Sequence, residues 1–328
     1  MKLKLLKFIY QLSPLFDVFL SILIIPGALM MLYFRRLGAK NYPLTSKVLK
    51  RIGVFPIRKH FDEPFFGELS EIHKSLNKKR DLPGIKLREN YQKLNLKKLI
   101  FENEFISFVE NSKKDNKESS FKIDNNSFAP GDSDFLYQFI RGYQPKRVLE
   151  IGCGTSTKII RQALQKNRQI YNYQTEHICV EPYKASYLDD FKEIKLIRER
   201  IELKSSKTKL HKLLSSGDML FIDSSHIIRP QGPVLYQFLE LIPKLKKGVL
   251  IHVHDIFTPY DYHPNSVIRD SFFWNEMYLL EALLTDSPKY EILFSLNFLN
   301  KNYHNDLKRV CPFLRKNQIL GSFYFQTK

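Results

Sequence analysis

The sequence predicts an α/β fold in which a mainly parallel sheet carries helices on both faces, preceded by an apolar N-terminal segment. Short β-rich runs alternate with helix-like stretches from residue 146 onward. Glycines and titratable residues gather where these runs end, at the edge where such sheets bind ligands. Near the N-terminus, residues 18–34 form an uncharged run of seventeen residues. These three observations define the expected fold class.

The apolar run places a membrane-associated segment at residues 1–45. As a straight helix it would be about 26 Å long, slightly short of a hydrocarbon core of roughly 30 Å. Pro26 and Gly27 lie in its middle, and both flanks are basic, so the orientation stays open. We expect a re-entrant hairpin or a single span; a signal peptide and a packed core helix are the alternatives.

A connector of short helices and loops is expected over residues 46–125, where proline interrupts short apolar segments. Its last part, residues 111–126, is polar and charged and predicts a surface loop or linker. The main domain is therefore expected over residues 126–328. At 328 residues the chain is long enough for one large domain with an appendage.

The main domain has seven strand candidates and three helix candidates between them. A parallel sheet is expected because strands and helices alternate. The expected strands are 146–151, 177–182, 194–203, 218–225, 248–255, 290–297 and 320–326, and the expected helices are 156–166, 233–245 and 271–284.

Charge and cysteine content limit the partners. The chain has 52 Lys and Arg against 34 Asp and Glu, a formal charge of +18, which favours anionic partners such as phosphorylated substrates, acidic lipid or nucleic acid. The three cysteines are too few and too scattered for a disulfide framework or a zinc knuckle. A reduced cytosolic setting is the simplest inference.

A cofactor site is predicted at the ends of the first two strands. In VLEIGCGTST, Gly152 and Gly154 let the backbone approach a cofactor closely, and the helix that begins near Thr155 offers free N–H groups. Glu181 ends the second strand, where a carboxylate can accept hydrogen bonds from two ribose hydroxyls. A nicotinamide enzyme would favour the fuller GxGxxG, which GCGTST lacks, so hydride transfer is disfavoured.

With Asp223 in FIDSSH, these motifs resemble the class I S-adenosylmethionine-dependent methyltransferases over residues 126–328. The resemblance implies a Rossmann-like seven-stranded sheet whose last two strands are antiparallel. It also implies S-adenosylmethionine as cofactor, held by Glu150, Gly152, Gly154, Thr155, Glu181 and Asp223. Glu150 has an alternative role, the support of the glycine loop. The Asn/Asp-Pro-Pro-aromatic motif of nucleobase methyltransferases is absent after the fourth strand, so base N-methylation is disfavoured.

FIDSSH followed by HVHDIF resembles a bacterial subgroup that includes sugar O-methyltransferases, and so implies a saccharide hydroxyl as acceptor. Such an acceptor must lose a proton, and His226, His254 and Asp255 lie at the ends of strands four and five as candidate catalytic groups. The resemblance further implies Mg²⁺ held by Asp223 and Asp255. His254 departs from that pattern, since Mg²⁺ prefers oxygen ligands.

Two neighbouring features have structural interpretations. His252 lies deeper in its strand and is predicted to be a hydrogen-bonded structural residue. Residues 274–278 predict a core helix, from which Glu276 could face the pocket.

The sequence thus predicts an O-methyltransferase that acts on a saccharide or lipid-linked saccharide at the cytoplasmic face of the inner membrane. One alternative is a membrane-bound scaffold with a vestigial cofactor site, against which the intact motif residues argue. The other is an RNA 2'-O-methyltransferase. It is disfavoured because the chain has no concentrated basic and aromatic stripe.

Overall fold

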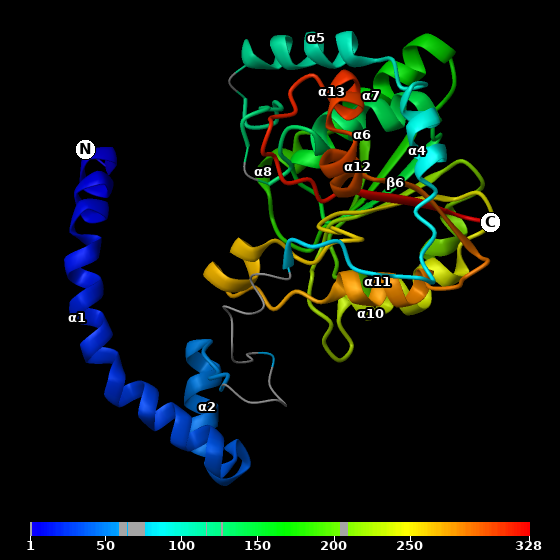
Figure 1. The fold of residues 1–328 in the computed structure, drawn as a ribbon. Coiled ribbons are helices and arrows are strands. Elements are labelled where there is room, and N and C mark those ends of the chain that lie inside the picture. The colour runs from blue at the N-terminus through cyan, green and yellow to red at the C-terminus, as the bar shows by residue number, and fades with distance from the viewer. Residues whose placement is uncertain (1, 59–63, 65–75, 116, 126, 204–208) are drawn as a thin grey trace. The chain divides into compact units, whose positions relative to one another are not determined.

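The computed structural model describes residues 2–58, 64, 76–115, 117–125, 127–203 and 209–328 (Figure 1). The part of the predicted connector between residues 59 and 75 lies outside the described residues, apart from Pro64. The chain divides into two compact units, Met1–Ile72 and His73–Lys328. Each is described by itself.

The first unit consists of α1 (Lys2–Leu37), η1 (Ala39–Asn41) and α2 (Pro43–Ile52). By length and composition, Phe16–Leu37 is apolar enough to cross a membrane, although a signal sequence near an N-terminus passes the same test. The helix continues through Pro26 without interruption. This continuity favours the single span over the hairpin, and membrane association stays a prediction.

The second unit is built on a seven-stranded sheet of order β3-β2-β1-β4-β5-β7-β6. All seven predicted strands are present and only their ends differ. Their bounds are β1 (Arg147–Ile151), β2 (Glu176–Val180), β3 (Ile194–Ile197), β4 (Met219–Ile222), β5 (Leu250–Val253), β6 (Tyr290–Ser295) and β7 (Phe323–Thr327).

The last two strands are antiparallel to one another, and only one of them is antiparallel to the rest of the sheet. β7 pairs antiparallel with both β5 and β6, so β6 runs in the direction of the other strands and β7 alone is reversed. The reason is the connection between them. After β6 the chain forms α12 (Leu296–Asn302) and α13 (His304–Val310) and then inserts β7 between β5 and β6.

Helices cover both faces of the sheet, as predicted. Neighbouring residues of a strand point to opposite faces, and Val148 and Leu149 accordingly belong to two different hydrophobic cores. The first core includes side chains of α6 (Asp132–Tyr143), α7 (Thr155–Tyr171), α12 and α13. The second includes those of α10 (Pro233–Leu235), η3 (Tyr236–Leu241), η4 (Ile242–Lys244) and α11 (Glu276–Leu284).

Five other helical elements are described in the second unit. They are α4 (Glu89–Leu96), α5 (Glu102–Lys113), α8 (Ser186–Asp189), η2 (Leu210–Leu213) and η5 (Asn265–Arg269). Of these, α4 and α5 contribute to the first core and η2 to the second.

Residues 111–126 differ from the expected surface loop, because Phe121 and Ile123 are buried. The Phe121 ring lies 6.1 Å from that of Phe105 on α5, which in turn lies 5.3 Å from Tyr137 on α6. Two apolar residues in a polar context give no periodic signal, so the sequence did not reveal this packing. The domain boundaries at 45 and 125 stay predictions, although residues 76–125 belong to the second unit.

The helix expected over 271–284 begins only at Glu276. The preceding residues pair with the loop after β4 instead. Asn275 donates its backbone N–H to the carbonyl of His226 at 2.9 Å, and its side-chain oxygen accepts from the N–H of Ile228 at 2.6 Å. These bonds hold the two segments beside the carboxyl end of β4.

Candidate active site

A cavity of about 580 Å³ opens at the carboxyl ends of β1, β2 and β4. Of the nine predicted site residues, six line it: Gly152, Gly154, Thr155, Glu181, Asp223 and His226. The other three, Glu150, His254 and Asp255, are not among its lining residues. The strand ends therefore bring most of the predicted site together.

Gly152 allows the loop after β1 to pass directly against the end of β4. Its φ is +84°, and a Cβ there would lie 1.8 Å from the backbone oxygen of Asp223. No larger residue fits without moving one of the two backbones. Gly154 differs, because its φ of −166° is extended and the nearest atom to an added Cβ is the Tyr187 hydroxyl at 3.9 Å. The loop is thus open where a ligand could approach it.

Glu150, in β1, supports this loop through buried hydrogen bonds. It is fully buried, and its Oε1 accepts hydrogen bonds from the hydroxyls of Ser156 at 2.7 Å and Thr157 at 3.0 Å. Its Oε2 lies 2.8 Å from Nε2 of His177 on β2. Burial lowers the pKa of His177, but Cys179 and Glu150 raise it more, to about 10. The geometry favours a positioning role for Glu150 over contact with a cofactor.

Glu181 stands at the cavity wall immediately after β2. Its Oε2 accepts the backbone N–H of Cys153 in the glycine loop at 3.1 Å, and its Oε1 accepts that of Tyr183 at 2.8 Å. Each carboxylate oxygen keeps a further lone pair for a ligand. The cavity wall thus holds a fixed acceptor beside the glycine loop, which fits the ribose-binding role expected from the sequence.

A cluster of two carboxylates and an imidazole lies on the β4 and β5 side of the cavity. Donor atoms of Asp223, His226 and Asp255 lie within 4.8 Å of one another, with His226 Nε2 at 3.3 Å from Asp255 Oδ2. Asp255 has a φ of +56°, a conformation that Asp adopts more readily than most residues. The two carboxylates fit a divalent cation that takes oxygen ligands, such as Mg²⁺ or Mn²⁺, and Nε2 of His226 lies beside them as a candidate proton acceptor.

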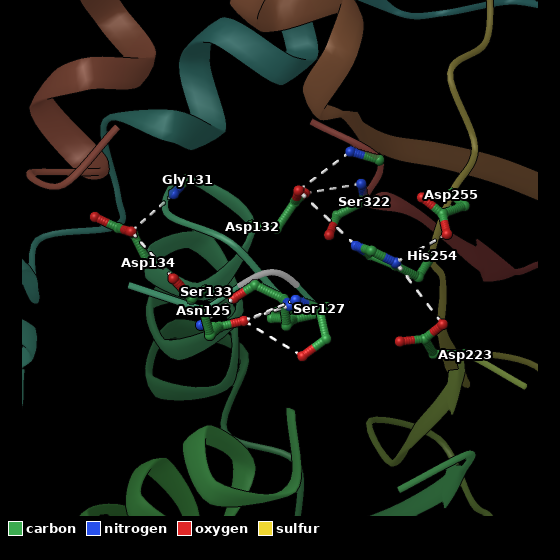
Figure 2. A network of polar contacts seen from close by, with 12 residues as sticks. Asn125, Ser127, Gly131, Asp132, Ser133, Asp134, Asp223, His254, Asp255 and Ser322 are labelled. Atoms are coloured by element: carbon green, nitrogen blue, oxygen red, sulfur yellow. Dashed lines mark hydrogen bonds and ion pairs between the residues drawn. The ribbon is translucent and has the colours of Figure 1, made fainter. Parts of the chain in front are cut away.

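His254 lies between three carboxylates, as Figure 2 shows. Its Nδ1 is 3.6 Å from Asp255 and 3.8 Å from Asp223, while Nε2 is 3.8 Å from Asp132. Burial lowers the pKa of His254, but the negative charges of Asp255 and Asp223 raise it well above its usual value. The neighbouring carboxylates therefore favour the protonated form of the imidazole.

His226 is held in a similar way, and Glu276 is its second partner. The buried Glu276 carboxylate hydrogen-bonds Nδ1 of His226 from the start of α11. Burial lowers the pKa of His226, but the hydrogen bond to Glu276 and the charges of Glu276 and Asp255 raise it to about 9. To act as a base near neutral pH, His226 would need these carboxylates partly neutralised, as a bound cation would do.

Asp132 is a site residue that the sequence analysis missed. It begins α6, is buried, and accepts backbone N–H groups of Ser322 at 2.9 Å and Gly321 at 3.2 Å (Figure 2). It thereby ties the approach to β7 to His254. Asp132 follows no strand, so only its run GDSD at the start of a helix marked it in the sequence.

His252 is buried as expected, but the predicted hydrogen bond is wrong. Among the described residues neither ring nitrogen has a hydrogen-bond partner. The ring stacks on Phe221 at a centroid distance of 4.2 Å, and burial lowers its pKa well below the usual value. His252 is therefore a neutral aromatic core residue.

Residues 149–256 match the family model of a methyltransferase domain. An uncharacterized protein of Archaeoglobus fulgidus is 38% identical over 64 residues, which are 20% of this chain and 28% of that protein. The matched part thus spans little more than a quarter of this curated relative.

Among solved structures, the similarities are low. An O-methyltransferase from Bacillus cereus in complex with S-adenosylhomocysteine is 14% identical, with 73% of this chain and 99% of that chain covered and a TM-score of 0.41. The MycE methyltransferase from the mycinamycin biosynthetic pathway, in complex with Mg and S-adenosylhomocysteine, is 20% identical, with 38% and 31% covered and a TM-score of 0.28.

The family match runs from β1 to the end of β5, and so includes the glycine loop, Glu181, Asp223 and Asp255. It supports a class I S-adenosylmethionine-dependent methyltransferase. The site fits that cofactor on its own evidence, since the open face at Gly154 and the Glu181 carboxylate lie in one cavity.

Proposed function

We propose that this protein transfers a methyl group from S-adenosylmethionine to a hydroxyl of a saccharide or lipid-linked saccharide. The observation that carries the proposal is the composition of one cavity. Gly154 and Glu181 lie at its cofactor side, and Asp223 and His226 lie at the side toward β4 and β5, next to Asp255. The first group suits a nucleoside, and the second suits a hydroxyl and its proton.

The chemistry assigns distinct tasks to the two sides. The cofactor, when bound, supplies an electrophilic methyl group on a sulfonium. The acceptor oxygen forms a bond to that carbon as the bond from carbon to sulfur breaks, so positioning of the acceptor determines most of the rate. The hydroxyl proton passes to His226, the predicted base that lines the cavity. Asp223 and Asp255 would hold a divalent cation, whose charge polarises the hydroxyl and favours the neutral imidazole.

An aromatic surface beside this cluster supports a sugar acceptor. Trp274 lines the cavity, and its ring centroid is 4.4 Å from that of His226 and 4.8 Å from that of Phe272, on which it stacks. A flat apolar surface next to carboxylates matches a sugar ring, which has a C–H face and a hydroxyl edge. The apolar α1 supports an acceptor at a membrane, and we propose the cytoplasmic face of the inner membrane as its place.

Calorimetric titration of S-adenosylmethionine into the full chain in detergent micelles tests the cofactor half of the proposal. Glu181→Ala should abolish binding, because it removes the carboxylate acceptor from the cavity. Glu176→Ala is the matched control, since Glu176 begins the same strand and pairs with Arg147 and Lys195 away from the cavity. If the folded wild-type chain fails to bind the cofactor, the enzyme proposal is refuted.

Transfer of a labelled methyl group to a panel of saccharides, with and without Mn²⁺ or Mg²⁺, tests the acceptor half. The expected product carries a methyl ether on a sugar hydroxyl. Label that appears instead in RNA or protein, with none in saccharides, would contradict the acceptor class while leaving the cofactor site intact.

A further inference from the structure

The helix α2 has an exposed apolar stripe that no part of its own unit covers among the described residues. Leu44, Val48 and Ile52 are spaced by four residues and so lie on one face of the helix. Their exposed fractions are 79%, 56% and 69%. Such a stripe on a short surface helix indicates a surface against which the helix packs.

The rest of α2 and its surroundings are strongly basic. Lys47, Lys50 and Arg51 are exposed on the other sides of the helix, and Arg35 and Arg36 lie in the last turn of α1. In the sequence, no Asp or Glu occurs between residues 18 and 61. The surface around the stripe is therefore complementary to an anionic partner.

Local packing fixes α2 to the basic end of α1. Phe34 is buried, with ring centroids of Tyr42 and Phe55 at 6.2 Å and 6.1 Å. The Arg35 guanidinium lies 5.0 Å from the centre of the Phe55 ring. Gly53 ends α2 with a φ of +89°. Figure 1 shows α2 turning back from the end of α1 within this unit.

We propose that α2 is an interfacial helix that binds a membrane surface containing anionic lipid. Leu44, Val48 and Ile52 would enter the boundary between headgroups and acyl chains, while Lys47 and Arg51 reach the lipid phosphates. A soluble anion could pair with the cations but would leave the stripe in water, whereas a lipid surface satisfies both features. The inference concerns the first unit only and does not depend on methyl transfer.

Quenching of tryptophan by brominated acyl chains tests the orientation of α2 in the full chain. Trp274, in the second unit, is the single tryptophan and gives the baseline. Val48→Trp places a reporter on the stripe, and Lys50→Trp places the matched reporter on the opposite face. In vesicles of phosphatidylcholine and phosphatidylglycerol, we expect strong quenching of the Val48→Trp reporter and little of the Lys50→Trp reporter.

Lipid charge is tested with the same Val48→Trp reporter. Quenching should fall when phosphatidylglycerol is omitted. Lys47→Gln or Arg51→Gln should each lower the equilibrium constant for binding of α2 to the vesicle surface about fivefold. Lys195→Gln, in the second unit, should change nothing. Equal quenching of the two reporters, or quenching that does not depend on phosphatidylglycerol, overturns the proposal. Calorimetric binding of S-adenosylmethionine by the same variants should be unchanged, which separates this result from the proposed function.

Discussion

Replacing Gly152 with alanine tests how the glycine loop is built. Its φ of +84° is unfavourable for any L-residue by about 1–2 kcal/mol. In addition, the new Cβ would lie 1.8 Å from the backbone oxygen of Asp223, so one backbone must move, at a cost of about 1–3 kcal/mol. The free energy of unfolding should therefore fall by about 2–5 kcal/mol.

Gly217→Ala separates the two contributions. Gly217 has nearly the same φ, +83°, but nothing lies within 4 Å of an added Cβ. Urea denaturation should show a loss of only about 1–2 kcal/mol for this variant. Gly154→Ala gives a third comparison, because its extended backbone tolerates alanine while the methyl group enters the open face of the loop. It should weaken S-adenosylmethionine binding with little effect on stability.

The reasoning is refuted if Gly152→Ala and Gly217→Ala lose the same stability. In that case the close approach between the loop and β4 would contribute nothing beyond backbone conformation. The displaced atom belongs to Asp223, so a shift there should also weaken cofactor binding in calorimetry. Unchanged affinity in Gly152→Ala would contradict the placement of Asp223 in the cavity wall.

Three further predictions concern charged groups in the polar networks of the site. The pKa of His177 is raised from 6.5 to about 10. Its protonation therefore contributes fully to the free energy of unfolding below pH 6.5, and this contribution is lost as pH rises toward 10. Urea denaturation should show this free energy falling between pH 6.5 and 10, and the fall should be smaller in Glu150→Gln. Asp132→Asn keeps one side-chain acceptor for the two backbone N–H groups of Gly321 and Ser322. The free energy of unfolding in urea should therefore fall by about 1–3 kcal/mol, and an unchanged denaturation midpoint would contradict the role of Asp132 in holding this segment. Asp255→Asn should weaken Mn²⁺ binding in calorimetry at least about tenfold, and unaltered binding would exclude Asp255 as a ligand.

The strands could be predicted because a buried parallel sheet leaves a clear pattern. RVLEI, EHICV and MLFI are short segments rich in buried apolar residues, and charged residues follow them at Glu181 and Asp223. The position of β7 between β5 and β6 had no such signal, since it depends on how α12 and α13 return the chain to the sheet. Local pattern therefore determines where strands lie, whereas connections determine their order and direction.

The candidate site was predictable for the same reason, but only in part. Glu181, Asp223 and Asp255 follow strands, and parallel strands bring their carboxyl ends to one edge. Asp132 and Glu276 instead begin helices far away in the sequence. Glu276 was expected only as a residue that could face the pocket, and nothing in the local pattern paired Asp132 with His254 or Glu276 with His226. Both contacts are long-range, and they became evident only when α6 and α11 were placed against the sheet.

The buried charges explain how one cavity keeps its two sides distinct. Glu150 joins β1, the start of α7 and β2 through Ser156, Thr157 and His177, so the cofactor loop rests on directional bonds rather than on apolar packing alone. Directional bonds fix side-chain geometry more narrowly than apolar contacts, and breaking one partner leaves a charge buried without compensation. At the other side, the network of His254 with Asp132, Asp223 and Asp255 holds the two strand-end carboxylates where we propose that the acceptor binds. Each side is therefore positioned by its own polar network, and a substitution in one should leave the geometry of the other largely intact.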